Sequence, residues 1–112
     1  MKIVINNCHG GFGLSNSAIE YYSKLKGWSI EKKKDPQWGN TYYAHTDGSY
    51  FTTRDIERND PDLIKTIEHL GEDQSSDSLS MLKIVEIPDD VKWQIDEYDG
   101  LEWVAEQHRT WS

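Results

Sequence analysis

Residues 60–71 read DPDLIKTIEHLG, and this stretch carries the complete pattern of an amphipathic helix. Asp60 is suited to the N-cap and Pro61 to the first helical position, where its missing N–H costs nothing. Four apolar residues follow at helical spacing and form one stripe, namely Leu63, Ile64, Ile67 and Leu70. Gly71 then closes the segment. We therefore expect a helix between Asp60 and Gly71 with one face buried.

A second helix is predicted nearer the N-terminus, at about residues 16–26. Its apolar stripe consists of Ala18, Ile19, Tyr22 and Leu25. Ser15 or Ser17 can cap its start, and Gly27 stands where a C′ glycine is expected. Residues 2–7 precede it and alternate in polarity with β-branched side chains, which predicts a first strand.

The remaining regular segments are predicted to be strands. The Asp47–Gly48 pair lies between β-prone runs and predicts a hairpin. Residues 81–87 form a strand-like run that Pro88 ends, and the alternation from 91 to 95 predicts another strand.

Asp99 and Gly100 offer a second hairpin turn, with 101–106 as the returning strand. A two-residue turn sets Glu97 opposite Glu102, a like-charge pair that costs stability. A longer loop or a C-terminal helix therefore stays open as an alternative.

These segments predict one α+β domain over residues 1–112, with two helices on an antiparallel or mixed sheet. Two stretches are expected to be loops. The first begins at the lysine run 32–34 and continues into Asp35 and Pro36, and the second is the polar segment 72–80.

The net charge of −8 is unevenly placed. Residues 72–112 contain eleven acidic and three basic residues, which accounts for the whole excess. Such a surface repels polyanions, so we expect no nucleic-acid partner. The lone Cys8 and the absence of a long apolar run predict a reduced, cytoplasmic protein that does not bind membranes. The many aromatic residues in so polar a chain predict a homo-oligomer.

The first candidate site is the turn Gly10–Gly13, between the first strand and the first helix. Its glycines let backbone N–H groups approach a ligand, and a helix N-terminus attracts phosphate. The run matches neither the dinucleotide fingerprint nor the P-loop. The alternative is a tight turn that requires glycine, with Phe12 in the core.

The second candidate is the C-terminal cluster His108, Arg109, Thr110 and Trp111. Arginine binds phosphate in a bidentate manner and tryptophan stacks on bases. Alternatively, Arg109 pairs with a local carboxylate while Trp111 packs on the sheet. No nucleophile–base pair or metal-binding spacing is visible, so we expect no enzyme activity, no catalytic residue, no metal and no cofactor.

Most of the chain, except about residues 28–54, resembles a widespread set of small phage and prophage proteins. The segments that carry this likeness are 5–15, 60–64, 83–91 and 97–111. The set is also similar to phage proteins that counter the Thoeris defence. Those are small homo-oligomers that sequester cyclic ADP-ribose-type signals without cleaving them.

The resemblance implies a viral anti-defence protein in the host cytoplasm that sequesters a phosphate-bearing nucleotide, cyclic ADP-ribose-like or a cyclic oligonucleotide. The predicted ligand-binding residues are Gly10, Gly11, Phe12, His108, Arg109 and Trp111. The alternative function is an acidic inhibitor that docks on a host protein, as a nucleic-acid mimic.

Replacing Arg109 with alanine tests the C-terminal cluster. Loss of a charge-assisted hydrogen bond to phosphate should weaken nucleotide binding about tenfold or more, while the melting temperature stays unchanged. Affinity and melting temperature are to be measured on the same variant. An unchanged affinity removes Arg109 from the site, and a large drop in melting temperature makes it a structural residue.

Overall fold

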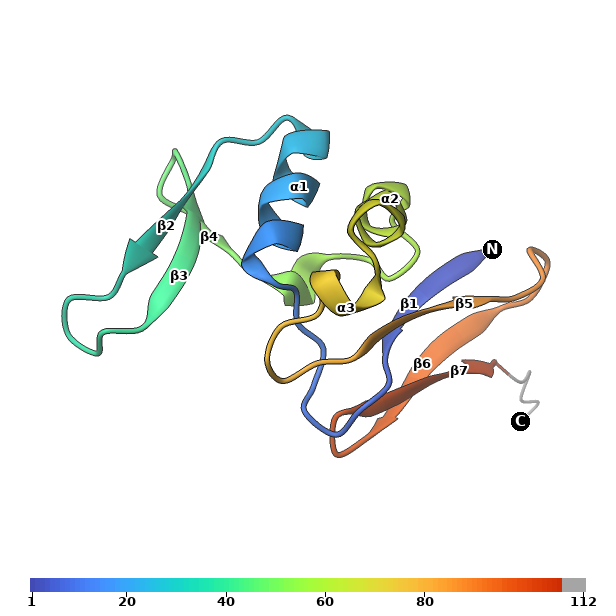
Figure 1. Ribbon diagram of the computed structural model, residues 1–112. Coiled ribbons are helices and arrows are strands. Elements are labelled where there is room, and N and C mark those ends of the chain that lie inside the picture. Colours follow the sequence, from blue (N-terminus) through green and yellow to red (C-terminus); the bar gives the residue numbers. More distant parts are fainter. Residues whose placement is uncertain (108–112) are drawn as a thin grey trace, which may run out of the picture.

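Three antiparallel sheets and three α-helices build the fold over residues 1–107, which are the residues that the computed structural model describes (Figure 1). The elements in chain order are β1 (Lys2–Asn6), α1 (Asn16–Lys26), β2 (Ile30–Lys34), β3 (Thr41–His45), β4 (Tyr50–Phe51), a 3-10 turn (Thr53–Asp55), α2 (Pro61–Leu70), α3 (Glu72–Ser75), β5 (Leu82–Glu86), β6 (Trp93–Tyr98) and β7 (Leu101–Glu106). The predicted α+β class is confirmed; of the antiparallel and mixed alternatives the pairing is antiparallel, and the strands form three sheets where one was expected.

Both predicted helices form with the expected caps. The Ser15 hydroxyl accepts a hydrogen bond from the Ala18 N–H (3.2 Å) at the start of α1. The Asp60 carboxylate accepts one from the Asp62 N–H (2.9 Å) at the start of α2. Gly27 ends α1 in the left-handed conformation, with φ 72°. These local signals fix where each helix begins and ends.

The prediction that residues 72–80 form a loop throughout is wrong at its start, where α3 adds a third helix. This short helix covers the outer edge of β5. The Glu72 carboxylate accepts a hydrogen bond from the Ile84 N–H (2.9 Å), and the Ser76 hydroxyl accepts one from the Leu82 N–H (2.9 Å). The polar side chains of the segment therefore satisfy backbone donors that an edge strand leaves open.

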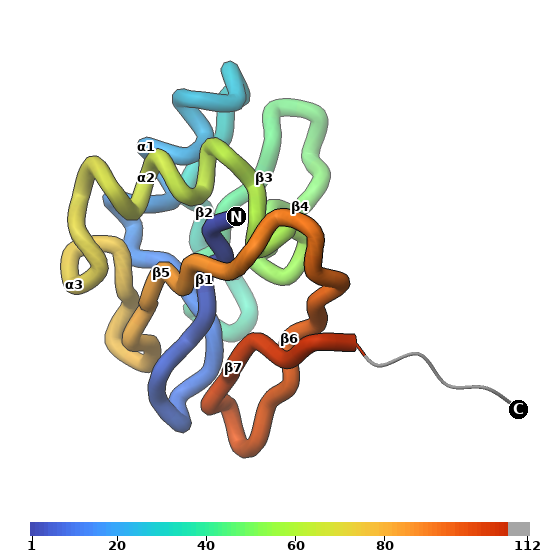
Figure 2. Tube along the Cα trace, turned by 90° about the vertical axis from the view of Figure 1, so that its right-hand side faces the viewer, coloured from blue at the N-terminus to red at the C-terminus, as the bar shows by residue number. Residues whose placement is uncertain are grey.

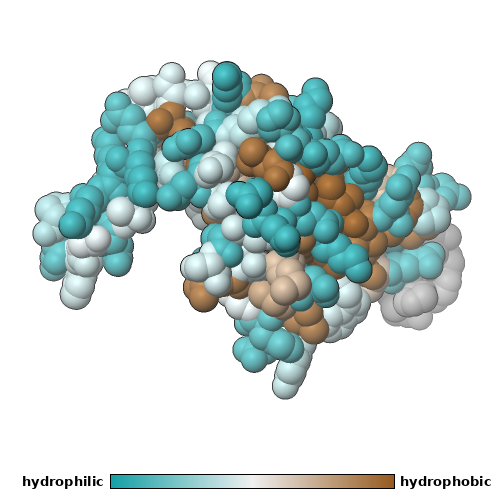
Figure 3. Space-filling model, viewed as in Figure 1, coloured by the Kyte–Doolittle hydropathy of each residue, from teal (hydrophilic) through white to brown (hydrophobic). Residues whose placement is uncertain are grey.

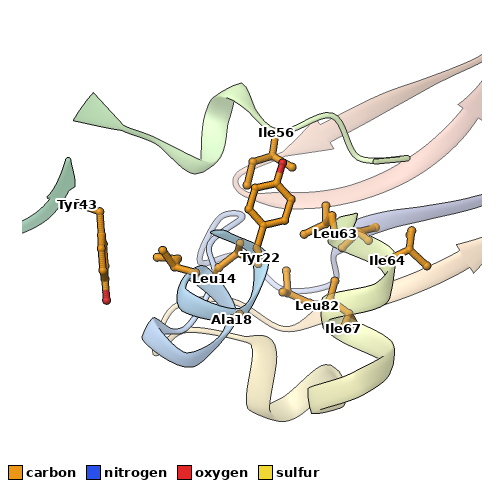
Figure 4. Packing of buried hydrophobic residues seen from close by; sticks show 11 residues of the cluster. Leu14, Ala18, Tyr22, Tyr43, Ile56, Leu63, Ile64, Ile67 and Leu82 are labelled. Atoms are coloured by element: carbon orange, nitrogen blue, oxygen red, sulfur yellow. The ribbon is translucent and has the colours of Figure 1, made fainter. Parts of the chain in front are cut away.

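The hydrophobic core lies between the helices and the two-stranded sheet β1–β5. Figure 4 shows its main side chains, which come from both helices, from Leu14, Ile56 and Leu82, and from β3. In Figures 1 and 2 the helices lie on one side of β1–β5 and the hairpin β6–β7 on the other. The sheet is thus covered on both faces, as its nearly continuous apolar strand Ile3–Ile5 requires.

The three-stranded sheet β2–β3–β4 projects to one side of this body (Figure 1). The predicted hairpin at Asp47–Gly48 joins β3 to β4, with Gly48 at φ 90°. The lysine run 32–34, expected to be a loop, belongs instead to β2, and its side chains are exposed. Lysines on an outer strand discourage edge-to-edge pairing. Figure 3 shows that the projecting part is largely hydrophilic on that face.

The predicted hairpin at Asp99–Gly100 is confirmed, and the alternative of a helix over residues 101–106 is wrong. Glu97 does lie opposite Glu102. The conflict is relieved because Glu102 turns to the guanidinium of Arg58, with contacts of 2.5 and 2.8 Å. The Glu102 carboxylate also covers the free edge of β1, because it accepts a hydrogen bond from the Asn6 N–H (2.8 Å).

Replacing Glu102 with glutamine should lower the free energy of unfolding by about 2–3 kcal/mol, because Arg58 then stays half-buried without its anion. Glu97→Gln is the matched control, since this exposed glutamate has no cation within the ion-pair distance among residues 1–107. It should change stability by less than about 0.5 kcal/mol. Urea denaturation of the two variants measures the difference; equal effects contradict the role given to the pair.

Candidate functional site

The glycine turn that follows β1 is held against the protein's own backbone. A side chain at Gly10 would collide with the carbonyl oxygen of Leu79, and one at Gly13 would collide with the Asp77 carboxylate. At the tip of the β6–β7 hairpin, a Cβ on Gly100 would lie 2.6 Å from the His9 carbonyl oxygen and 2.7 Å from the Gly11 nitrogen. Close packing against backbone therefore explains the glycines at positions 10 and 100, whereas at Gly13 the neighbour is a side chain that can move.

Phe12 stands apart from its glycine neighbours because it contributes a ring to the molecule's interior. Its ring lies 3.6 Å from the guanidinium carbon of Arg58, a cation–π contact, and it packs against the core. The alternative expectation, Phe12 in the core, is met only in part, because the ring is partly buried and packs against the core from its edge. The same residue also lines a surface pocket.

The predicted residues His108, Arg109 and Trp111 lie outside the described residues. Within the described part, Gly100 lies against the glycine turn, whereas Glu106 ends β7. Six residue steps along a strand separate these two positions by about 20 Å. The structure therefore joins the glycine turn to the beginning of β7 and not to its end.

The pocket beside Phe12 has a volume of about 320 Å³ and is named here the hydroxyl pocket. It lies between the turn before α1 and the sheet β2–β3–β4. The lining residues are Phe12, Gly13, Leu14, Ile19, Thr41, Tyr42, Tyr43, Phe51, Thr52, Thr53 and Asp77. Hydroxyl-bearing residues thus alternate with apolar and aromatic ones, as in small-molecule sites that combine apolar walls with a few polar groups.

Tyr43 is the most distinctive residue of the hydroxyl pocket. It is 9% exposed, and its hydroxyl is buried without a hydrogen-bond partner among the described residues. Burial, and secondarily the negative charge of Glu20, raise the pKa of this phenol, so it remains a neutral donor at physiological pH. In Figure 4 Tyr43 stands apart from the other labelled side chains, with Leu14 the nearest of them. A buried donor without a partner is costly, and because this hydroxyl is closed to solvent, a ligand acceptor reaches it only where the Tyr43 side chain moves.

Two lysines of β2 are paired with residues that line the hydroxyl pocket, although neither lysine is itself a lining residue. Lys32 pairs with Tyr43 and Lys34 with Thr41 in the β2–β3 register. Side chains of directly paired residues share one face of a sheet, so Lys32 and Lys34 lie on the face of Tyr43 and Thr41, whereas Lys33 lies on the opposite face with Tyr42, which also lines the pocket. Sequence reasoning missed this arrangement because three consecutive lysines carry no alternation of polarity. This arrangement becomes visible only from the β2–β3 pairing register, which the structure provides.

Asp77 is the carboxylate among the pocket-lining residues, and it is already engaged in a turn. One of its oxygens accepts a hydrogen bond from the Leu79 N–H (2.9 Å).

The side chains of Cys8 and His9 contact other parts of the protein. The Cys8 thiol lies 3.4 Å from both the Asn6 amide oxygen and the Leu79 carbonyl oxygen, and the His9 ring nitrogen Nδ1 lies 3.2 Å from the Asp99 carbonyl oxygen.

Two broader features can be stated for residues 1–107. No three or more His, Cys, Asp or Glu side chains come together there in a group that could hold a metal ion. None of the helices in this part has the length and apolar character needed to cross a membrane.

Substitution of single glycines separates packing from ligand binding in the turn. Gly10→Ala should cost about 3 kcal/mol or more, because the new methyl group meets backbone that cannot move aside. Gly11→Ala meets no atom within 4 Å and should cost only about 1–2 kcal/mol for its φ of 94°. Thermal denaturation ranks the two variants. A Gly11→Ala protein that folds but no longer binds nucleotide would assign Gly11 to the ligand site.

Comparison with known proteins assigns the chain to no family: no family model, no curated protein and no solved structure matches it.

Proposed function

We propose that this protein binds a phosphate-bearing nucleotide signal, of the cyclic ADP-ribose or cyclic oligonucleotide type, and holds it without cleaving it. In a phage this activity would counter a host defence by sequestration. The observation that carries the proposal is the hydroxyl pocket, with its unpartnered Tyr43 hydroxyl and with Lys32 and Lys34 on the same sheet face.

Each part of the pocket suits one part of a nucleotide. The aromatic ring of Phe51 offers a stacking surface for a base, and the threonine hydroxyls can bond ribose oxygens. The two lysines supply positive charge for phosphate. The net charge of −8 opposes an anionic ligand only weakly, because charges beyond about 8 Å are screened at physiological ionic strength.

Retention without cleavage follows from the chemistry of the pocket's titratable groups. The raised pKa of Tyr43 keeps its phenol protonated, which favours hydrogen bonding over nucleophilic attack. Asp77 is engaged by the Leu79 N–H. Neither group is arranged with a partner that would activate it, so the pocket is suited to binding.

The test uses the lysines, because β2 supplies its own control. The double variant Lys32→Ala/Lys34→Ala should lose about tenfold or more in affinity for cyclic ADP-ribose isomers or cyclic oligonucleotides, measured by calorimetry. Lys33→Ala removes a charge from the other face of the same strand and should leave affinity within about twofold.

The ligand recovered after denaturing the complex should be chemically intact by chromatography. Cleaved product in excess over protein contradicts sequestration. Equal losses of affinity in the Lys33 and Lys32/Lys34 variants would place the phosphate elsewhere.

The alternative function, an acidic inhibitor that docks on a host protein, draws on the β6–β7 hairpin. Exposed acidic residues and two exposed aromatic side chains are distributed along this hairpin: Glu97, Asp99, Glu106, Tyr98 and Trp103. Such a surface is compatible with a basic protein partner. The same calorimetry separates the two functions, because the inhibitor requires no nucleotide affinity in the wild-type protein.

A further inference from the structure

A second recess lies on the other side of β4 from the hydroxyl pocket and is named here the acid–aromatic cleft. Its main cavity, about 550 Å³, is lined by Tyr22, Lys26, Trp28, Asp55, Glu57, Asn59, Asp60 and Pro61. A smaller recess of about 130 Å³ shares Tyr22, Trp28 and Asp55 with it, so the two are adjacent. Neither includes the glycine turn or the lysines of β2.

The inner end of the cleft is built from aromatic rings held edge to face around Trp28. The Trp28 ring lies 5.8 Å from Tyr22, 5.1 Å from His45 and 6.2 Å from Phe51 between centroids, at interplanar angles of 65–77°. Trp28 is nevertheless 41% exposed. Edge-to-face packing fixes the rings while leaving part of the indole open to a ligand.

The positive charge inside the cleft is already neutralised. Lys26 lies 3.0 Å from a carboxylate oxygen of Asp60 and 3.0 Å from one of Asp62. Hydrogen bonds to Asp62 and Asp60 raise the pKa of this lysine, so it stays charged and bound in place. Asp60 also accepts the Tyr22 hydroxyl at 2.7 Å.

Two further carboxylates in the cleft have no such partner. Asp55 and Glu57 are exposed, and within residues 1–107 their side chains form no ion pair and no hydrogen bond. Both stand on the segment that leads into α2, beside the open indole of Trp28. Unpaired carboxylates next to a tryptophan face are the chemistry that recognises an organic cation, through ion pairing and cation–π attraction.

We propose that the acid–aromatic cleft binds an organic cation, an alkylammonium or guanidinium group, which lies over Trp28 and pairs with Asp55 and Glu57. The main cavity is large enough for a whole basic side chain and the peptide units beside it. Such a group can come from an arginine or lysine of a protein or from a free polyamine. This proposal does not rest on the nucleotide proposed above, because the main cavity of the cleft and the hydroxyl pocket have no lining residue in common.

The experiment titrates the full-length protein with three probes while following the indole N–H signal of Trp28 by NMR. The probes are N-acetyl-arginine amide, spermidine and, as the uncharged isostere, N-acetyl-citrulline amide. The two cations should bind saturably, and the citrulline probe should bind at least about tenfold more weakly. A tighter arginine probe identifies a protein side chain as the natural ligand, and tighter spermidine identifies a free polyamine.

The variant Asp55→Asn/Glu57→Gln should weaken cation binding about tenfold, because it removes both unpaired carboxylates and keeps their shape. Its matched control, Asp73→Asn/Glu106→Gln, removes two exposed carboxylates outside the cleft and should change affinity by less than about twofold. Trp28→Phe keeps a ring with a weaker face and should bind less tightly than wild type. Equal losses in the two charge variants, or equal binding of citrulline and arginine probes, would overturn the proposal.

Discussion

The contact between Arg58 and Glu102 is the constraint on which the rest of this structure depends. It joins two segments 44 residues apart in sequence. The guanidinium is held between the Phe12 ring and the carboxylate, and it also donates to the Val4 carbonyl oxygen at 3.3 Å. One cation thus ties the first strand, the glycine turn and the C-terminal hairpin together. A charge in such a position requires its partner, since an unpaired ion that is half-buried is expensive.

This constraint explains how a sheet of only two strands, β1–β5, persists at the centre of the domain. Two-stranded sheets are marginal alone and need covering elements. Helices cover one face and the β6–β7 hairpin the other, while side-chain carboxylates close both edges, Glu102 at β1 and Glu72 at β5. The glycine turn is part of this closure. Gly10 is therefore committed to internal packing, whereas Phe12 and Gly13 also line the hydroxyl pocket between the turn and the projecting sheet.

The two recesses that flank β4 differ in charge and share a wall. Phe51 and Thr52 line both the hydroxyl pocket and the smaller part of the acid–aromatic cleft. On one side lysines stand on the sheet face of Tyr43, and on the other side carboxylates stand beside an exposed indole. Because the short strand β4 lies between the two recesses, one small domain can carry both the proposed anion site and the proposed cation site. A ligand in either recess would lie next to the Phe51 residue, so the two sites are physically adjacent.

The sequence by itself determined the helices α1 and α2 and both predicted hairpins, because their signals are local: Ser15 and Asp60 as caps, and Asp–Gly turns between β-prone runs. It also identified the Glu97–Glu102 conflict. It did not predict β2, because three consecutive lysines show no alternation of polar and apolar residues. It did not predict α3 either, because this polar segment is held by hydrogen bonds to the edge of β5. Of the predicted ligand-binding residues, Phe12 lines the hydroxyl pocket, next to Gly13 of the same turn. The pockets and the Arg58 contact were decided by tertiary structure alone, because each unites residues far apart in sequence, and local propensity carries no information about which distant side chains meet.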